Sequence, residues 1–252
     1  MPRLMATQDD QIISIPGPGN FQFSAIKIEN LGASEYTLVT IVCDISGSVN
    51  AFAVPLLNCI KSIVEACQKS PRSENLLVRL VVFNYTVIEI HGFKDLKTID
   101  VNDYKPLVPD GMTVLYDGTY DAVGATIEFS SVLKKNDYDD VNGAVYIITD
   151  GMDNRSKIRP KEIADKIAIA KKGEQIISLI TILVALNDPS SPDPEVTKYL
   201  SKFQAEANID QFIDIGDATP QKLAKLANFV SQSISSQSQA LQSGVPSQQL
   251  AF

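Results

Sequence analysis

The sequence predicts an α/β protein: an open, doubly wound, mostly parallel sheet with helices on both faces and one antiparallel hairpin at an edge. Short apolar runs rich in β-branched residues occupy 36–43, 144–148 and 176–185, as in parallel strands buried on both faces. Segments with the apolar spacing of helices separate these runs, and such alternation is typical of a doubly wound sheet. Two more apolar runs, 76–85 and 87–91, are joined by a very short turn and predict the hairpin.

The chain before the first central strand divides into two parts. Residues 1–20 are expected to form a flexible N-terminus, because the Pro-Gly-Pro-Gly sequence at 16–19 interrupts regular structure. Residues 21–35 are expected to form an accessory strand and a linker. Their apolar residues alternate with one slip, which is typical of a bulge in an edge strand; these residues are Phe21, Phe23, Ile26 and Ile28.

The region 36–234 is expected to form a single domain, since it contains no internal repeat and no second set of core elements. Beyond the runs already described, a short strand is predicted at 212–215. Helices are predicted at 49–68, 116–133, 160–171, 194–207 and 220–234. Pro160 stands at a favoured first-turn position. The remaining residues, 235–252, are rich in serine and glutamine and are predicted to be a disordered tail.

Composition limits the classes of partner and compartment. The 252 residues carry a formal net charge of −8 and are 44% hydrophobic. This acidity argues against nucleic acid or an anionic membrane as the main partner. The three cysteines lie outside any CxxC or Cys/His cluster, so no disulfide framework is expected and a reducing compartment is favoured. With no secretory pattern and no apolar run of membrane-spanning length, we expect a soluble cytoplasmic protein.

Oxygen-bearing side chains gather in three segments that follow predicted strands or precede helices. The sequence Asp44-Ile45-Ser46-Gly47-Ser48 follows the first buried run, Thr113 precedes a helix, and Asp150 follows the run ending at 148. An α/β sheet collects its ligand groups at the carboxyl ends of its strands. Aspartate, serine and threonine oxygens suit a hard divalent cation such as Mg²⁺. Taken singly, these residues could instead be helix caps, with Asp44, Ser48 or Thr113 accepting backbone N–H groups.

The three segments together resemble the von Willebrand factor A (VWA) domain and its metal-ion-dependent adhesion site. That pattern has Asp-x-Ser-x-Ser, then a distant threonine, then a distant aspartate, and it falls here on Asp44, Ser46, Ser48, Thr113 and Asp150. The resemblance covers roughly residues 36–231 and implies a Rossmann-like fold. Met112 stands where such sequences often have a second glycine. Within the family, the sequence is most similar to stand-alone bacterial or phage proteins of the TerY-like type, found in tellurite-resistance and stress loci.

The resemblance implies a metal-dependent protein-interaction module that works as an adaptor or scaffold and is not an enzyme. Ser46 and Ser48 would coordinate Mg²⁺ directly, Thr113 would do so when a ligand is engaged, and Asp44 and Asp150 would act largely through water. Mn²⁺ or Ca²⁺ could replace Mg²⁺. The open coordination position would take a carboxylate from a partner protein. The expected partners therefore include neither nucleic acid nor membrane. Asp44 is expected to face the metal and water, so its loss should leave the fold intact.

Two other functions compete with this one. A Mg²⁺-dependent hydrolase or phosphotransferase could use Asp44 and Asp150, but Ser46 stands where aspartate-nucleophile phosphatases usually place a second acid. The sequence also lacks a Walker A lysine motif and a nucleophile elbow. The single histidine, His91, is predicted at the exposed end of the edge hairpin, away from the site. A structural domain with a vestigial site is disfavoured because all five motif residues are present.

Overall fold

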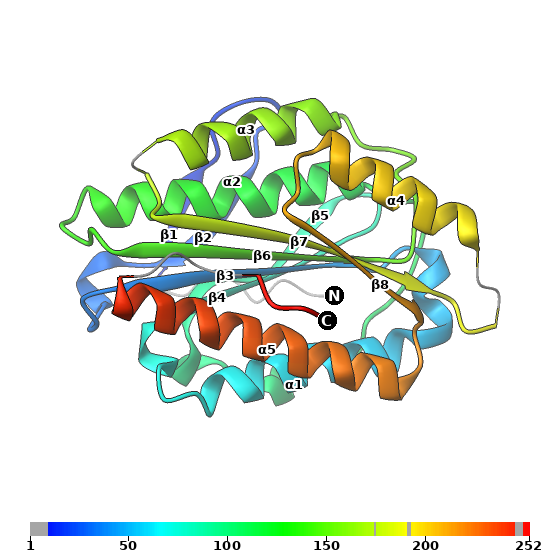
Figure 1. Cartoon of the computed structure of the whole chain (residues 1–252), viewed down its shortest axis with the longest axis horizontal. Coiled ribbons are helices and arrows are strands. Elements are labelled where there is room, and N and C mark those ends of the chain that lie inside the picture. The colour runs from blue at the N-terminus through cyan, green and yellow to red at the C-terminus, as the bar shows by residue number, and fades with distance from the viewer. Residues whose placement is uncertain (1–9, 174, 191–192, 245–248) are drawn as a thin grey trace.

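The computed structural model describes residues 10–173, 175–190, 193–244 and 249–252, which form one eight-stranded sheet covered by helices on both faces (Figure 1). The strands are β1 (Asp10–Ser14), β2 (Gln22–Ile26), β3 (Tyr36–Asp44), β4 (Leu76–Phe83), β5 (Val87–Asp95), β6 (Val141–Thr149), β7 (Ser178–Asn187) and β8 (Gln211–Asp217). The α-helices are α1 (Ala53–Gln68), α2 (Leu115–Lys134), α3 (Pro160–Lys172), α4 (Pro194–Glu206) and α5 (Pro220–Ser243). Short 3-10 helices are η1 (Ile28–Asn30), η2 (Gly47–Phe52), η3 (Ser73–Asn75), η4 (Leu96–Thr98) and η5 (Val101–Asp103).

The strand order is β1-β2-β5-β4-β3-β6-β7-β8. The pairs β4–β3, β3–β6, β6–β7, β7–β8 and β2–β5 are parallel. The pairs β4–β5 and β1–β2 are antiparallel. The predicted fold class is therefore confirmed. The β4–β5 hairpin, however, lies inside the sheet, because the accessory strand β2 adds to β5 and β1 then forms the edge. The sequence pattern showed that β2 was a strand but not where it paired.

The central strands place the candidate site at one edge of the sheet. Every residue of β3, β4 and β6 is buried, which explains why their sequences are mostly apolar and β-branched. In the parallel register of β3 and β6, Cys43 lies opposite Ile148. The next residues of each strand, Asp44 and Thr149, therefore lie at the same edge, and Asp150 follows directly.

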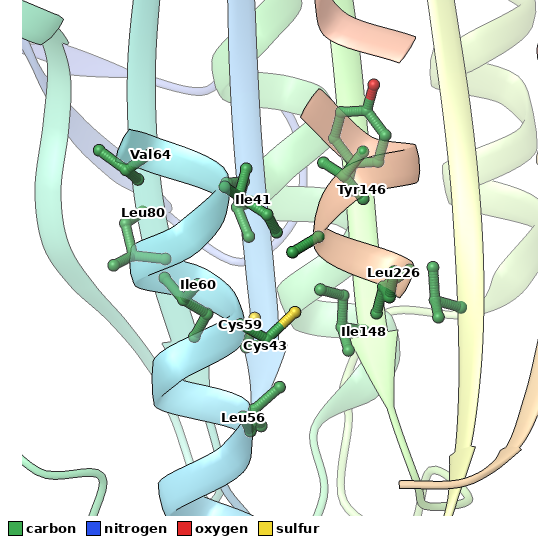
Figure 2. Packing of buried hydrophobic residues seen from close by; sticks show 14 of the residues in the cluster. Ile41, Cys43, Leu56, Cys59, Ile60, Val64, Leu80, Tyr146, Ile148 and Leu226 are labelled. Carbon is green, nitrogen blue, oxygen red and sulfur yellow. The ribbon is translucent and has the colours of Figure 1, made fainter. Parts of the chain in front are cut away.

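Two layers of helices bury the two faces of the sheet. Helices α2, α3 and α4 cover one face, and α1 and α5 cover the other (Figure 1). Figure 2 shows the second layer, in which Cys43 and Cys59 pack among aliphatic side chains. All three cysteines are buried and free, and burial raises the pKa of Cys59 to about 12. Cys43 thus packs as a small apolar residue.

One helical segment among the described residues, Gly47–Gln68, is long and apolar enough to cross a membrane by length and composition alone. In this structure, one face of the segment packs in the core, whereas Val54 on the other face is exposed. Leu56, Ile60 and Ile63 of α1 are buried in the cluster between α1, α5 and the sheet. The same composition is expected of a core helix in a soluble domain.

The prediction of a flexible N-terminus is wrong from residue 10 onward, and residues 1–9 lie outside the described part of the chain. Strand β1 pairs with β2 over its whole length. Ile15 is buried, and the carbonyl of Pro16 accepts hydrogen bonds from Tyr120 Oη and Lys166 Nζ, both at 3.2 Å. The Pro-Gly-rich sequence is thus the connection between two strands, held by contacts with α2 and α3.

The predicted disordered tail is also wrong for 235–243, where α5 continues to Ser243. Gln237 and Ser238 of this stretch are buried in polar contacts that composition does not show. Gln237 Nε2 donates to Ser233 Oγ (3.2 Å), which also accepts from Tyr146 Oη (3.0 Å), and Arg72 Nε donates to Ser238 Oγ (2.8 Å). After residues 245–248, which lie outside the described part, the carbonyl of Leu250 accepts a hydrogen bond from Gln211 Nε2 (2.9 Å).

His91 is buried, which corrects the prediction of an exposed strand end. Its Nδ1 lies 2.9 Å from the carbonyl oxygen of Gly92 and its Nε2 lies 2.9 Å from Tyr104 Oη. A carbonyl can only accept, so Nδ1 carries the proton and Nε2 accepts from the tyrosine. Burial lowers the pKa of His91 to about 4. The side chain became buried because β2 and the segment around Tyr104 cover β5 on both sides.

Acidification is therefore expected to destabilise the fold through His91. The folded pKa lies below the unfolded value, so the contribution is fully present above about pH 6.5 and is lost as the pH falls towards about 4. The difference between the unfolded and folded pKa values corresponds to about 3 kcal/mol of unfolding free energy, at 1.36 kcal/mol per pKa unit. Urea unfolding from pH 7 to pH 4 should show a flatter pH dependence in His91→Gln than in the wild type. Parallel curves for the two proteins would contradict this assignment.

Candidate metal centre

The first segment leaves β3 as a tight turn. Asp44 is the last residue of β3, and its Oδ1 accepts the backbone N–H of Ser46 (2.7 Å). Ile45 is buried and fixed on both sides, since its N–H donates to the carbonyl of Phe83 (2.8 Å) and its carbonyl accepts from Asp110 N (3.0 Å). Ser46 precedes η2 and makes no side-chain cap. The alternative interpretation of these residues as helix caps therefore does not describe the structure.

The second segment is bonded onto the first. Gly47 N donates to the carbonyl of Gly111 (3.3 Å). The backbone of Gly111 has a φ of +77°, which glycine adopts without strain. Thr113 lies two residues before α2. Val114 occupies the capping position without a side-chain bond, so Thr113 is not the helix cap. Its hydroxyl is free to serve the site.

The third segment fixes the second in place. Asn154 Oδ1 accepts from Thr113 N (2.9 Å), and Asn154 N donates back to the carbonyl of Thr113 (3.1 Å). Asp153 Oδ2 accepts from Tyr116 N (3.2 Å) in the first turn of α2. Asp153 and Asn154 therefore act as capping residues of a neighbouring loop and helix. The three segments form one rigid unit at the carboxyl edge of the sheet.

The structure brings all five candidate residues together. Ser46 Oγ lies 3.2 Å from Ser48 Oγ, which donates to Asp150 Oδ1 (3.0 Å). A Cβ placed on Gly151 would lie 3.3 Å from Thr113 Oγ1 and 3.5 Å from Asp44 Oδ2. The threonine hydroxyl and the Asp44 carboxylate therefore face the same small space, which the glycine leaves free. Their roles as metal ligands stay predictions.

Thr149 and Gly151 were not identified from the sequence as residues of the site. Thr149 Oγ1 donates to Asp44 Oδ2 (2.6 Å), so both oxygens of Asp44 already hold a donor. Gly151 provides the free space beside Thr113. A hydroxyl as the last residue of a strand, followed by aspartate and glycine, was the available signal. Its meaning depends on the register of β3 against β6.

Burial within the site is uneven. Asp44 is 1% exposed and Asp150 is 7% exposed, and Ser46 and Thr113 are also buried. Ser48 is exposed. The expectation that Asp44 faces water is therefore wrong, because its two oxygens are held inside the protein by Ser46 N and Thr149 Oγ1. Access from solvent is on the side of Ser48.

The electrostatics of the site favour a cation. Burial and, to a smaller extent, the charge of Asp44 raise the pKa of Asp150 to about 7, and the hydrogen bond from the Ser48 hydroxyl acts in the opposite direction. Burial also raises the pKa of Asp44, against hydrogen bonds from Thr149 and Ser46. Within the described ranges, neither carboxylate forms an ion pair. Two buried, unpaired carboxylates beside three hydroxyls fit a hard divalent cation.

Other metal chemistry has little support elsewhere in the fold. In the part of the chain that the structure describes, no group of three or more histidine, cysteine, aspartate or glutamate side chains could hold an ion. The candidate centre itself has only two carboxylates and depends on serine and threonine for the rest. Such an all-oxygen set suits Mg²⁺, Mn²⁺ or Ca²⁺ better than soft metals.

No protein family and no curated protein matches the sequence. The fold is similar to solved structures of low sequence identity. Proximal thread matrix protein 1 from the mussel byssus, solved with a zinc-occupied MIDAS motif, is 16% identical with a TM-score of 0.51; the match covers 79% of this chain and 46% of that one. The PilB minor pilin from Streptococcus sanguinis is 14% identical with a TM-score of 0.52, covering 91% and 76%.

A third similar structure is the pilus adhesin SpaC from Lactobacillus rhamnosus GG, 12% identical with a TM-score of 0.54, covering 90% of this chain and 34% of the adhesin. The chain thus spans about half the length of the mussel protein and a smaller part of the adhesin. At these identities the likeness establishes the fold alone. Together with the strand order and the helix layers, it shows that this chain has the Rossmann-like fold of a von Willebrand factor A domain.

Proposed function

We propose that this protein is a metal-dependent protein-interaction module that binds an acidic side chain of a partner. One observation carries the proposal: two buried carboxylates without ion pairs lie among three hydroxyls at the carboxyl edge of the sheet. Ser46, Ser48 and Thr113 would hold Mg²⁺, with Mn²⁺ or Ca²⁺ as substitutes. When bound, the metal supplies a Lewis-acidic position that a carboxylate from the partner can occupy.

The hydrogen bonds of Asp44 support its role in this scheme. Each of its oxygens already accepts a donor, from Ser46 N and from Thr149 Oγ1. A carboxylate held in this way is oriented to accept from metal-bound water. Asp150, which accepts from Ser48, would act similarly. The zinc-occupied MIDAS motif of the mussel protein supports the capacity of this fold to hold a divalent ion.

Calorimetric titration with Mn²⁺ is expected to detect one binding site that is weakened about tenfold or more in Ser48→Ala. Ser48 is exposed, so its loss should leave the fold intact. Ser34→Ala is the matched control, because Ser34 is also exposed but precedes β3 at the opposite edge of the sheet. Equal Mn²⁺ affinity in all three proteins would show that the ion binds elsewhere or not at all.

The same preparations separate an adaptor from a Mg²⁺-dependent hydrolase or phosphotransferase. We infer that the protein is not an enzyme, since His91 is engaged with Gly92 and Tyr104 and cannot serve the site. ATP, GTP and a generic phosphomonoester should therefore not be hydrolysed above background with Mg²⁺ present. Turnover that is lost in Asp150→Ala would replace the adaptor proposal with the hydrolase.

We further infer a cytoplasmic protein of the TerY-like type, acting in a bacterial or phage stress response. The three unpaired, buried cysteines support a reducing compartment, and the net charge of −8 supports protein partners over nucleic acid or membrane. Fractionation of producing cells tests the location: recovery outside the cytoplasm would contradict it.

A further inference from the structure

Large apolar side chains are exposed beside the candidate metal centre. Tyr85, Val108 and Met112, here termed the apolar rim, are 45%, 62% and 39% exposed. Tyr85 lies in the β4–β5 turn, and its ring rests on Gly111, where an added Cβ would lie 1.8 Å from a ring carbon. Met112 directly precedes the candidate ligand Thr113. The rim is therefore built onto the same loops as the centre.

A cation lies over this rim. The guanidinium of Arg155, in the loop after β6, is 5.9 Å from the centre of the Tyr85 ring. Arg155 is exposed and, within the described ranges, forms no ion pair. The whole chain carries a net charge of −8. An unpaired arginine stacked on an exposed tyrosine offers both charge and apolar surface to a partner.

The opposite side of the centre has the opposite charge. Asp188 directly follows β7, and its Oδ1 accepts hydrogen bonds from Ser190 N (2.8 Å) and Ser190 Oγ (2.7 Å). The strand order β4-β3-β6-β7 places the Tyr85 turn on one side of the centre and the Asp188 loop on the other. A carboxylate of a partner is therefore attracted at Arg155 and repelled on the side of Asp188.

We propose that the partner element is an acidic segment of another protein with three recognition groups. A first carboxylate reaches the metal, an apolar side chain packs on Tyr85 and Met112, and a second carboxylate pairs with Arg155. The inference rests on the proposed function and specifies the partner of that site. Charge complementarity selects an acidic segment, and the exposed tyrosine, methionine and arginine are residue types that anchor such contacts.

The test uses labelled peptides on a Gly-Ser background, measured by fluorescence anisotropy in Mg²⁺ and again in EDTA. One peptide carries a single aspartate, the second adds a phenylalanine, the third adds a glutamate beyond the phenylalanine, and the fourth has lysine in place of that glutamate. Both chain directions are included. In the wild type, affinity should rise about tenfold with phenylalanine and about threefold more with glutamate, and lysine should remove the second gain.

Variants assign each gain to its residue. Tyr85→Ala should abolish the phenylalanine gain and leave binding of the single-aspartate peptide unchanged. Arg155→Glu should reverse the preference for glutamate over lysine. Lys172→Glu is the control for net charge, because Lys172 is exposed at the far end of α3 and should change nothing.

The outcomes distinguish this inference from the proposed function. Metal-dependent binding with equal affinity for all four peptides would overturn the rim and Arg155 while leaving the carboxylate-binding centre in place. A preference that persists in Arg155→Glu would equally overturn the assignment of that arginine. If no peptide binds in Mg²⁺ even at millimolar concentration, both the proposed function and the further inference are wrong.

Discussion

Asp121→Ala is expected to lower the free energy of unfolding by about 3–5 kcal/mol, because it leaves a buried guanidinium without one of its two carboxylate partners. Arg79 in β4 is 1% exposed, and its Nη1 lies 2.8 Å from Asp121 Oδ2. Its Nε donates to Glu89 Oε2 (2.7 Å), so the arginine lies between two acids. Burial raises the pKa of Asp121, and Arg79 counteracts that rise.

Chemical denaturation should show this loss at pH 7. Glu206→Ala is the matched control, since Glu206 forms an ion pair with Lys202 at the surface of α4 and should cost less than about 1 kcal/mol. Replacing both Arg79 and Asp121 by apolar residues should cost less than the sum of the single changes. An Asp121→Ala protein as stable as Glu206→Ala would show that the buried pair contributes little.

Gly92→Ala is expected to destabilise the protein by about 3 kcal/mol, at the upper end of the range for overpacking. An added Cβ would lie 1.8 Å from the carbonyl oxygen of Ser24, in the backbone of β2. A backbone atom cannot move aside as a flexible side chain can, so β2 must separate from β5. The hydrogen bonds from Ser24 N and Oγ to Glu89 Oε1 (3.0 and 2.7 Å) would be strained with it.

Amide hydrogen exchange can locate the damage from Gly92→Ala. Exchange should accelerate in β1 and β2 and change little in β6 and β7. Gly32→Ala provides the control, because a Cβ there meets nothing within 4 Å and the change should be neutral or slightly stabilising. Uniform acceleration across the whole sheet would contradict a local separation of β2 from β5.

Local chemistry made much of the candidate centre visible in the sequence. Asp44, Ser46 and Ser48 are close in sequence, and a buried strand before them indicates where they lie. Thr113 and Asp150 required knowledge of the three-segment pattern. The functions of Thr149 and Gly151 depend on atoms contributed by distant segments, such as Asp44 Oδ2 and Thr113 Oγ1, so no local rule could assign them.

The sequence by itself determined the alternation of buried strands and helices, and hence the fold class, because hydrophobic periodicity is a local property. Only the tertiary structure decided which polar or breaker-rich segments became ordered. The Ser/Gln-rich end of α5 is helical because Tyr146 and Arg72 bond its serines, and the hairpin became internal because β2 adds to β5. Likewise, Asp44 is buried where β6 brings the Thr149 hydroxyl to its carboxylate. In each case the stabilising contacts are made with residues distant in the chain, and composition and local spacing do not reveal those contacts.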